Sequence, residues 1–283
     1  MTAPFAPRNV FFCSAEKTAT WDSLGVGRVD AVIIDLEDDV LPANKDSARA
    51  LVPAVIDRLD PGIDIFVRSN SPRSAWFAAD IAALAPLARI AALVIPKVES
   101  PGDLRTAQSL VEAATGRPLP LLAVLESPPA FIDLERIAAA PVPLAGFTMG
   151  PFDLSRALGC ARDDDAPPVA LARTQALMAA RTFGHIAIDG PVARDLQGEA
   201  RQAAFRRARA MGFDAKIVTN LDDADAVRAI FTPTAEELAL AGDIAAAFAA
   251  RPGAELAFLA NGATVDQRNL ILSNRLLAKR RTA

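Results

Sequence analysis

Sulfur and imidazole side chains are scarce in this 283-residue chain. It contains two cysteines, Cys13 and Cys160, a single histidine, His185, and no tyrosine. Two cysteines cannot form a framework of several disulfides, and such sparse use is typical of proteins from a reducing compartment. So few sulfur and imidazole groups argue against a zinc site and against a Ser-His-Asp triad. We therefore expect any bound metal to have oxygen ligands.

Long apolar runs and a strong charge imbalance are also missing. The apolar region at residues 84–96 contains Arg89 and two prolines, so it falls short of the roughly 18 apolar residues of a membrane helix. The start, MTAPFAPRNVFF, has no basic segment before a long apolar stretch, and we expect no signal peptide. The net charge of −4 indicates neither a nucleic-acid partner nor a membrane surface. The expected location is the cytoplasm.

What the chain does contain is a series of short apolar runs that alternate with helical stretches. The runs are rich in Val, Ile, Leu and Phe and are bounded by Gly, Pro or polar residues, which is typical of buried parallel strands. They cover residues 10–13, 31–37, 63–68, 91–96, 119–126, 144–150, 186–189 and 215–219. The helical stretches cover residues 43–57, 75–87, 101–114, 129–139, 169–183, 195–211 and 222–230. This alternation predicts an α/β fold, a (β/α)8 TIM barrel.

The pattern changes after the eighth run. Residues 234–250 predict a helix that opens with a Thr-x-x-Glu capping box, and residues 266–281 predict another helix. We expect residues 1–231 to form the barrel, and residues 232–283 to form a C-terminal helical appendage.

Charged and polar residues gather where the predicted strands end. Chemistry in such barrels takes place at the carboxyl ends of the strands, so these side chains should share one mouth. They are Glu37, Asp38, Arg68, Lys97, Glu126, Asp153, Asp189 and, nearby, Asn220. His185 precedes the seventh run, and we expect it to have a structural role at the opposite end.

Glu126 and Asp153 are the predicted metal ligands. They follow the fifth and sixth runs, so two carboxylates that are distant in sequence could converge at the mouth. Mg²⁺ prefers oxygen ligands, commonly one or two carboxylates with water and substrate oxygens. A helix cap or a salt bridge is the alternative role for either residue.

Arg68 ends the third run in IFVRSN and could present its guanidinium to a carboxylate or to an enolate oxygen. A structural ion pair is the alternative. Lys97 is predicted to organise the site, paired with Glu99 or with a neighbouring strand end, rather than to form a Schiff base.

The segment DLED at residues 35–38 places three carboxylates within four positions. Adjacent residues on a strand face opposite sides, so these acids cannot all serve one site. Glu37 is our candidate for organising a metal-bound water or the substrate, and Asp38 for orienting Lys97 or Arg68. Acids attracted to the start of the next helix are the alternative.

Seven ordered segments resemble the citrate lyase β-subunit-like group of the HpcH/HpaI aldolase superfamily. They are RNVFF, AVIIDLEDDVLPANKDSAR, VRSN, VIPKVESPGDL, LESPPAFIDLERIAA, MGPFDLSRALG and GFDAKIVTN, and the resemblance extends over about residues 8–266. It implies that Glu126 and Asp153 bind Mg²⁺ and that Arg68 contacts substrate and stabilises an enolate.

The resemblance also implies a role for the appendage. Malyl-CoA and citramalyl-CoA lyases use an aspartate from the C-terminal segment of a neighbouring subunit, and NGATVD at residues 261–266 resembles that segment. Asp266 is therefore the implied acid/base, in a homo-oligomer, a trimer or hexamer, whose appendages pack on neighbouring subunits. Without the resemblance, Asp266 would be predicted to cap a helix. The predicted catalytic residues are then Arg68, Asp266 and Glu37, and the predicted substrate-binding residues are Arg68, Lys97 and Asp38.

Two segments depart from the pattern of many relatives. Residues 13–15 stand where relatives have Val-Pro-Gly, and residues 215–221 stand where they have Gly-Lys-x-x-Ile-His-Pro. In relatives both segments help to shape the acyl-CoA site. The expected function is a Mg²⁺-dependent carbon-carbon lyase that cleaves a β-hydroxyacyl-CoA, such as malyl-CoA or citramalyl-CoA, into an acyl-CoA and glyoxylate or pyruvate. The alternatives are a metal-dependent aldolase for a free hydroxy-oxoacid without CoA, and a non-catalytic citrate-lyase-like subunit.

Overall fold

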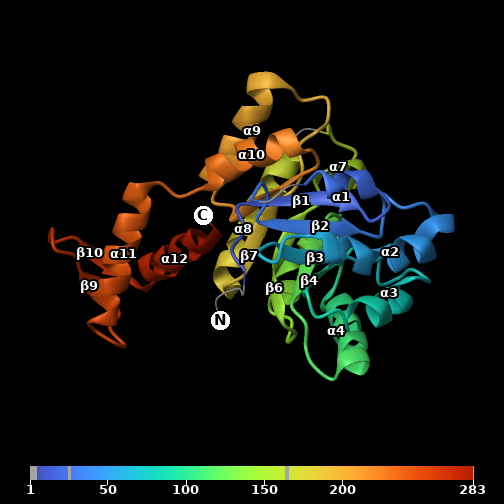
Figure 1. Ribbon diagram of the computed structural model, residues 1–283. Coiled ribbons are helices and arrows are strands. Elements are labelled where there is room, and N and C mark those ends of the chain that lie inside the picture. Colours follow the sequence, from blue (N-terminus) through green and yellow to red (C-terminus); the bar gives the residue numbers. More distant parts are fainter. Residues whose placement is uncertain (1–4, 25–26, 163–165, 283) are drawn as a thin grey trace.

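Eight parallel strands close into a barrel in the computed structural model, which describes residues 5–24, 27–162 and 166–282 (Figure 1). Each strand pairs with the next in the chain, and the first strand pairs with the eighth. The strands are β1 (Asn9–Ser14), β2 (Ala31–Asp35), β3 (Asp64–Arg68), β4 (Ile90–Ile95), β5 (Leu121–Leu125), β6 (Leu144–Met149), β7 (Ile186–Asp189) and β8 (Ala215–Val218). This closure confirms the predicted TIM barrel.

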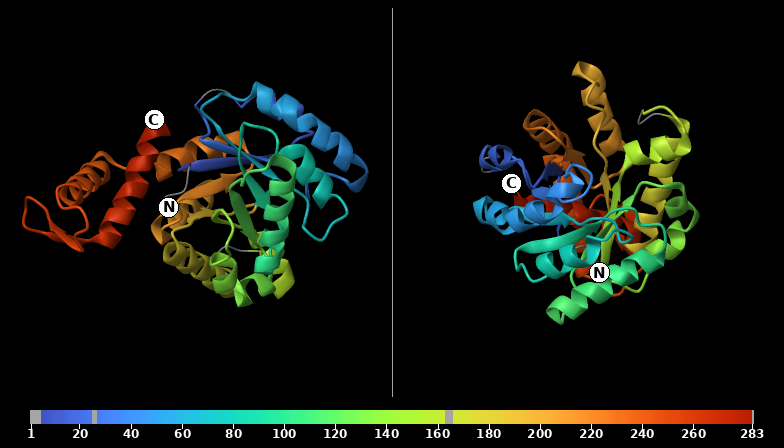
Figure 2. Two further views of the ribbon diagram at one scale, coloured as in Figure 1. Left: turned by 90° about the horizontal axis from the view of Figure 1, so that it is seen from below. Right: turned by 90° about the vertical axis from the view of Figure 1, so that its right-hand side faces the viewer.

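Helices surround the strands, as the two views in Figure 2 show. They are α1 (Thr18–Asp22), α2 (Lys45–Arg58), α3 (Phe77–Leu84), α4 (Pro101–Thr115), α5 (Pro128–Ile132), α6 (Leu134–Ala138), α7 (Pro151–Leu158), α8 (Pro167–Phe183), α9 (Gly198–Met211) and α10 (Leu221–Phe231), with a 3₁₀ turn η1 (Pro42–Asn44). The prediction of one helix over residues 129–139 was wrong. The backbone leaves the helical region at Asp133 (φ −105°, ψ 16°), and α6 then directs Leu134 and Ile137 into the core. The short helices α1 and α7 had not been predicted.

Alternation along the strands builds two apolar layers. One set of side chains, including Ile33, Phe66 and Leu122, fills the inside of the barrel. The intervening set, including Val32 and Val67, packs outward against the helices. Burying each such side chain contributes about 1.5–3 kcal/mol. Because a slip of one residue would exchange the two layers, the packing fixes the strand register and with it the side chains at the mouth.

The loop from β4 into α4 shows how the sequence sets the ends of a helix. Ser100 and Asp103 form a capping box at the start of α4, and Pro101 occupies its first position. Gly116 ends the helix with φ 67°, a backbone conformation that favours glycine.

The C-terminal appendage contains a small sheet as well as the two predicted helices. Its elements are α11 (Ala235–Ala249), β9 (Leu256–Phe258), β10 (Thr264–Asp266), α12 (Gln267–Ala278) and the 3₁₀ turn η2 (Lys279–Thr282). Thr234 and Glu237 form the predicted capping box of α11. The two strands are antiparallel and add a small sheet to the predicted helical appendage. Ile244 and Phe248 of α11 bury the sheet residues Ala257 and Val265, because alternate strand residues meet the apolar face of that helix.

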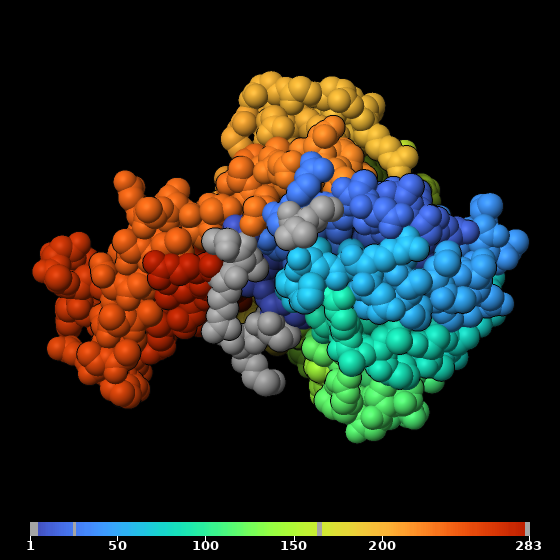
Figure 3. All heavy atoms as spheres, viewed as in Figure 1, coloured from blue at the N-terminus to red at the C-terminus, as the bar shows by residue number. Residues whose placement is uncertain are grey.

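The appendage projects from the amino-terminal end of the barrel, to the left in Figure 3. The end of α12 contacts the amino ends of the strands, where Arg275 donates a hydrogen bond to the carbonyl of His185 and Lys279 donates one to the carbonyl of Asp214. His185 and Asp214 immediately precede β7 and β8, so the appendage lies away from the mouth of its own barrel. Within the ranges described above, no helix is both long and apolar enough to cross a membrane.

Candidate active site

The carboxyl ends of the strands open into a cavity of about 860 Å³. Arg68, Glu126, Asp153 and Asp38 are among the residues that line it. The structure therefore brings these four predicted residues to one mouth, because parallel strands of a closed barrel all end on the same side.

Arg68 is held rigidly at this mouth. Its Nε donates to Oδ1 of Asp35 at 2.5 Å, and its Nη1 lies 3.1 Å from Oε2 of Glu37. The guanidinium also lies over the ring of Phe12, 4.7 Å from the ring centroid. Two carboxylates and an aromatic ring thus fix one orientation of the permanently charged fork.

Asp35 is the residue that the sequence interpretation missed. It is fully buried and also accepts hydrogen bonds from the backbone N–H groups of Glu37 and Asp39. Burial would raise the pKa of Asp35, but the charge and hydrogen bond of Arg68 hold it below its ordinary value. Alternation places Asp35 and Glu37 on the same inward face as Ile33, whereas Ile34 and Leu36 face the outer layer. The cross-strand register, which pairs Asp35 with Arg68, is the signal that could have identified it.

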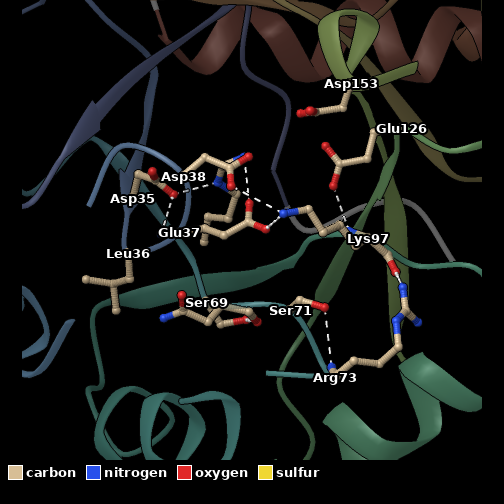
Figure 4. A network of polar contacts seen from close by, with 12 residues as sticks. Asp35, Leu36, Glu37, Asp38, Ser69, Ser71, Arg73, Lys97, Glu126 and Asp153 are labelled. Atoms are coloured by element: carbon tan, nitrogen blue, oxygen red, sulfur yellow. Dashed lines mark hydrogen bonds and ion pairs between the residues drawn. The ribbon is translucent and has the colours of Figure 1, made fainter. Parts of the chain in front are cut away.

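Lys97 bridges two acids of the DLED segment. Its Nζ lies 2.7 Å from Oε1 of Glu37 and 3.2 Å from Oδ1 of Asp38 (Figure 4). Glu99, the other partner considered for Lys97, pairs instead with Arg73. Burial would lower the pKa of Lys97, but the two carboxylates raise it above its ordinary value, which favours the cation over the neutral amine that a Schiff base requires.

The backbone of Lys97 has a second role. Its φ of 52° is the only positive φ of a non-glycine residue among the described residues, a conformation that costs about 1–3 kcal/mol. In this conformation the N–H of Lys97 donates to Oε1 of Glu126 at 2.7 Å. One residue therefore orients Glu37 with its side chain and Glu126 with its backbone.

Lys45, which had not been predicted, binds the backbone of the loop that follows β2. Its buried ammonium donates to the carbonyls of Leu36 and Glu37, at 2.8 and 2.6 Å. It reaches these groups from the first residue of α2 and fixes the turn that follows β2.

Glu126 and Asp153 lie on the same side of the mouth (Figure 4). Glu126 follows β5 and is 3% exposed, whereas Asp153 lies in the first turn of α7 and pairs with the exposed Arg156 at 3.0 Å. Burial, together with the charges of Glu37 and Asp153, raises the pKa of Glu126 to about 8, although the charge of Arg68 and the hydrogen bond from Lys97 oppose this rise. No ion pair joins Glu126 to a cation in the part of the chain that the structure describes. Glu126 is thus a buried acid without an ion-pair partner among these residues, and it lies beside Asp153, whose partner Arg156 is exposed.

The position of the Glu126 carboxylate is set by close packing on a glycine. A Cβ built on Gly150 would lie 2.4 Å from Cβ and 2.6 Å from Oε2 of Glu126. Only glycine leaves room for Glu126 at this approach. Within the described ranges, no group of three or more His, Cys, Asp or Glu side chains could hold a metal ion. The two carboxylates could still hold a divalent cation that takes its remaining ligands from water or substrate.

Several other predicted residues lie outside the mouth. Asp189 forms a buried network with Arg173 at 2.9 Å and Lys216 at 2.5 Å, so its expected place in the mouth was wrong. Its side chain faces outward from β7 toward α8, whereas its neighbour Ile188 points into the barrel. Asn220 accepts a hydrogen bond from the backbone N–H of Asp223 and caps α10.

His185 and Asp266, which were not predicted at the strand ends of the same chain, also lie away from the mouth. The ring Nε2 of His185 lies 2.9 Å from the carbonyl of Ala138, in agreement with a structural role. Asp266 caps α12, where it accepts hydrogen bonds from the N–H groups of Arg268 and Asn269, and it does not reach the mouth of its own chain.

Four cations that had not been predicted line the mouth cavity: Lys17, Arg156, Arg162 and Arg194. They lie in loops and short helices outside the strands, where no hydrophobic periodicity predicts which way a side chain points. They provide positive charge around the acidic pair Glu126 and Asp153.

The fold and this mouth define a class: a (β/α)8-barrel enzyme with an acidic pair and an anchored arginine at the carboxyl ends of its strands. The model of the HpcH/HpaI aldolase/citrate lyase family matches residues 8–220, and the chain belongs to this family of carbon-carbon lyases. The resemblance inferred from the seven sequence segments is thereby confirmed.

Similar proteins extend over nearly the whole chain. A (3S)-malyl-CoA thioesterase of Cereibacter sphaeroides is 32% identical over 275 residues, which cover 96% of this chain and 94% of the relative. A citrate lyase subunit beta-like protein of Deinococcus radiodurans is 32% identical over 292 residues, with 98% and 99% covered. The crystal structure of protein CitE from Mycobacterium tuberculosis in complex with magnesium, acetoacetate and coenzyme A has a TM-score of 0.71 at 29% identity, and 98% of each chain is covered.

Proposed function

We propose that this protein is a Mg²⁺-dependent carbon-carbon lyase that cleaves a β-hydroxyacyl-CoA, such as malyl-CoA or citramalyl-CoA, into an acyl-CoA and glyoxylate or pyruvate. The observation that carries the proposal is the buried Glu126 carboxylate beside Asp153, without a counter-ion and next to the anchored guanidinium of Arg68. The CitE complex with magnesium, acetoacetate and coenzyme A supports it.

Glu126 and Asp153 would hold the Mg²⁺ ion, with the oxoacid half of the substrate and water completing its ligands. When bound, the ion would supply Lewis-acid polarisation of the oxoacid oxygens. Close packing against Gly150 and the hydrogen bond from Lys97 keep Glu126 in one orientation, which is what a metal ligand requires.

Cleavage requires a base, an anion site and an acid. The hydroxyl proton of the substrate passes to a base, and the bond between the hydroxyl-bearing carbon and the thioester α-carbon breaks. Its electron pair moves into the thioester enolate while the hydroxyl becomes the carbonyl of the oxoacid. Arg68 stabilises the enolate oxygen. Glu37 is our candidate for the base, because burial raises the pKa of this carboxyl above its ordinary value.

Asp266 of an adjacent subunit would protonate the enolate carbon and complete the acyl-CoA product. In its own chain Asp266 lies in the appendage, at the other end of the molecule from the mouth. The appendage exposes five large apolar side chains, a feature typical of a surface that is covered by another protein. They are Leu240, Leu256, Phe258, Ile271 and Leu272. A homo-oligomer, a trimer or hexamer, would cover them and complete each active site.

The CoA half of the substrate would occupy the outer part of the mouth. Lys17, Arg156, Arg162 and Arg194 line the cavity and could contact its phosphates. Cys13 and Thr219, which belong to the two segments that depart from relatives, also line the cavity. The proposal therefore includes binding of the pantetheine arm against Cys13 and Thr219, where this chain differs from relatives.

The proposal is tested by assaying malyl-CoA and citramalyl-CoA cleavage with the purified full-length chain. We expect oxoacid release that stops with a chelator and returns with Mg²⁺. Glu126→Gln should abolish it, whereas Glu135→Gln, the same change at an exposed position of α6, should not. A chelator-resistant rate, or full activity of Glu126→Gln, would contradict the assignment. Cleavage of only the free hydroxy-oxoacid would favour an aldolase that does not use CoA.

A separate experiment tests the shared active site. Arg68→Met and Asp266→Asn should each be inactive alone, and mixed oligomers assembled from both chains should regain activity, because some mouths then combine an intact Arg68 with an intact Asp266. The control is Asp243→Asn on the exposed face of α11, which should stay active. Mixed oligomers without activity would contradict a trans role for Asp266.

Thioester hydrolysis is a second candidate function, and it rests on one observation: 32% identity to the (3S)-malyl-CoA thioesterase over nearly the whole chain. The products distinguish the two reactions. Hydrolysis releases malate and free CoA with no glyoxylate, whereas cleavage releases glyoxylate with the thioester intact.

A further inference from the structure

A second cavity lies at the opposite end of the barrel, between α12 and the amino ends of β7 and β8. Its volume is about 220 Å³. The wall is partly apolar, with Phe5, Ile186 and Ile271, and partly charged, with Arg275 and Lys279. It is separate from the mouth, since the packed interior of the barrel lies between the two cavities.

Positive charge is in excess around this cavity. Arg275 and Lys279 face it from the appendage, and Arg181 approaches from α8. The carboxylate among the cavity-lining residues is that of Asp214, which is already paired with Arg181 at 2.9 Å. The pKa of Lys279 is lowered to about 8, chiefly by burial; Asp214 opposes this effect, and the charges of Arg209 and Arg181 add to it. Among the described residues that line the cavity, cationic side chains therefore outnumber carboxylates.

One donor of the cluster has no acceptor. Nη1 of Arg275 is shielded from solvent and makes no hydrogen bond with the described part of the chain, while Nη2 donates to the carbonyl of His185 at 3.3 Å. Lys279, 5% exposed, donates to the carbonyl of Asp214 at 2.6 Å. A buried guanidinium donor without a partner is costly, and an oxyanion would satisfy it.

We propose that this cavity binds a small aliphatic carboxylate, with its oxygens on Arg275 and Lys279 and its carbon chain against Ile186 and Ile271. The apolar wall favours such a ligand over inorganic phosphate. Bound there, the carboxylate neutralises the like charges between α12 and the barrel and so stabilises the docking of the appendage.

Calorimetric titration of the full-length chain with butyrate tests the proposal. Ionic strength is held constant, and a chelator removes metal-dependent binding at the mouth. We expect one site, weakened at least about tenfold in Arg275→Gln, because a charge-assisted hydrogen bond is lost. Arg280→Gln removes the same charge from the neighbouring exposed position and should bind normally.

A second variant covers the case in which Arg275→Gln folds poorly. Asn274 lines the same cavity and is exposed, so Asn274→Asp adds a carboxylate there with little change in shape. It should weaken butyrate binding by a similar factor. Equal binding by the wild type and both cavity variants would overturn the proposal. Phosphate binding that is tighter than butyrate binding and depends on Arg275 would overturn the ligand class.

A crystal structure of the full-length chain grown with butyrate is an independent measurement. A carboxylate within hydrogen-bond distance of Arg275 supports the proposal. An empty cavity at a concentration that saturates the calorimetric signal overturns it.

Discussion

Asp35→Asn is the substitution that most directly tests how the mouth is built. The change keeps the shape of the side chain but removes the negative charge that faces Arg68 across 2.5 Å. Asp35 is fully buried and the Arg68 side chain is 11% exposed, so water cannot replace the lost partner. The variant therefore leaves a buried guanidinium with Glu37 as its remaining ion-pair partner among the described residues.

The expected loss of stability follows from this burial. Removing one partner of a buried pair costs about 3–5 kcal/mol. We expect at least the lower end, because the amide oxygen can replace only one of the two carboxylate oxygens, and the backbone N–H groups of Glu37 and Asp39 donate to different ones. For a domain of this size, about 3 kcal/mol corresponds to a melting temperature lower by roughly 6–10 °C. The matched control is Asp22→Asn, whose exposed pair with Arg58 should be worth about 0–1 kcal/mol.

The pH dependence of this difference has a definite sign. The pKa of Asp35 in the folded chain lies below its ordinary value of 3.8, so the carboxylate contributes its full stability above that value. The contribution is lost as the pH falls below 3.8 and through the lowered folded pKa. The gap in melting temperature between wild type and variant should therefore be constant from about pH 5 to pH 8 and should shrink below about pH 4.

Activity should fall together with stability. A guanidinium misplaced by about 1 Å can cost about 100-fold in turnover. Thermal melts over the pH series and steady-state kinetics at a temperature where both chains are folded measure the two effects. If Asp35→Asn melts within error of Asp22→Asn and keeps the wild-type turnover number, the claim that Asp35 positions Arg68 is refuted.

Two further predictions concern packing and charge elsewhere. Gly150→Ala should displace Glu126, lower the free energy of unfolding by about 1–3 kcal/mol and sharply weaken Mg²⁺ binding. The control Gly242→Ala, in open space on α11, should be neutral or slightly stabilising. Mg²⁺ titrations that are unchanged in both variants would contradict the packing argument. Burial and the charge of Asp30 raise the pKa of Asp64 to about 6, so the folded state loses stability as the pH rises from about 4 through 6. Asp64→Asn should therefore raise the melting temperature at about pH 7 but not at about pH 4. A shift of the melting temperature that does not depend on pH would contradict this.

The fold could be predicted because its signals are local. Runs of β-branched and apolar residues recur at the spacing of strands, and cap signals such as Ser100 with Asp103 mark where helices begin. The break of the helix at Asp133 and the strands β9 and β10 escaped prediction, since they depend on which neighbours each short segment meets in space.

The candidate site was predictable only in part. Residues that end strands, such as Arg68 and Glu126, could be placed at the mouth from chain order alone. Asp35 and Lys45 could not, because their roles depend on the turn after β2 and on the start of α2. Asp189 was misplaced for a related reason: which face of β7 it occupies depends on the strand register of the closed barrel.

By itself, the sequence determined the barrel, the end of the barrel that carries the charged residues, and the family, because each of these follows from the order and spacing of residue types along the chain. Only the tertiary structure decided that Asp35 and Glu37 anchor Arg68, that Lys97 aims its backbone at Glu126, that Gly150 makes room for that carboxylate, and that Asp266 lies far from the mouth of its own chain. These depend on contacts of a few ångströms between segments that are distant in the sequence, and such contacts exist only once the strands have closed and the core has fixed their register.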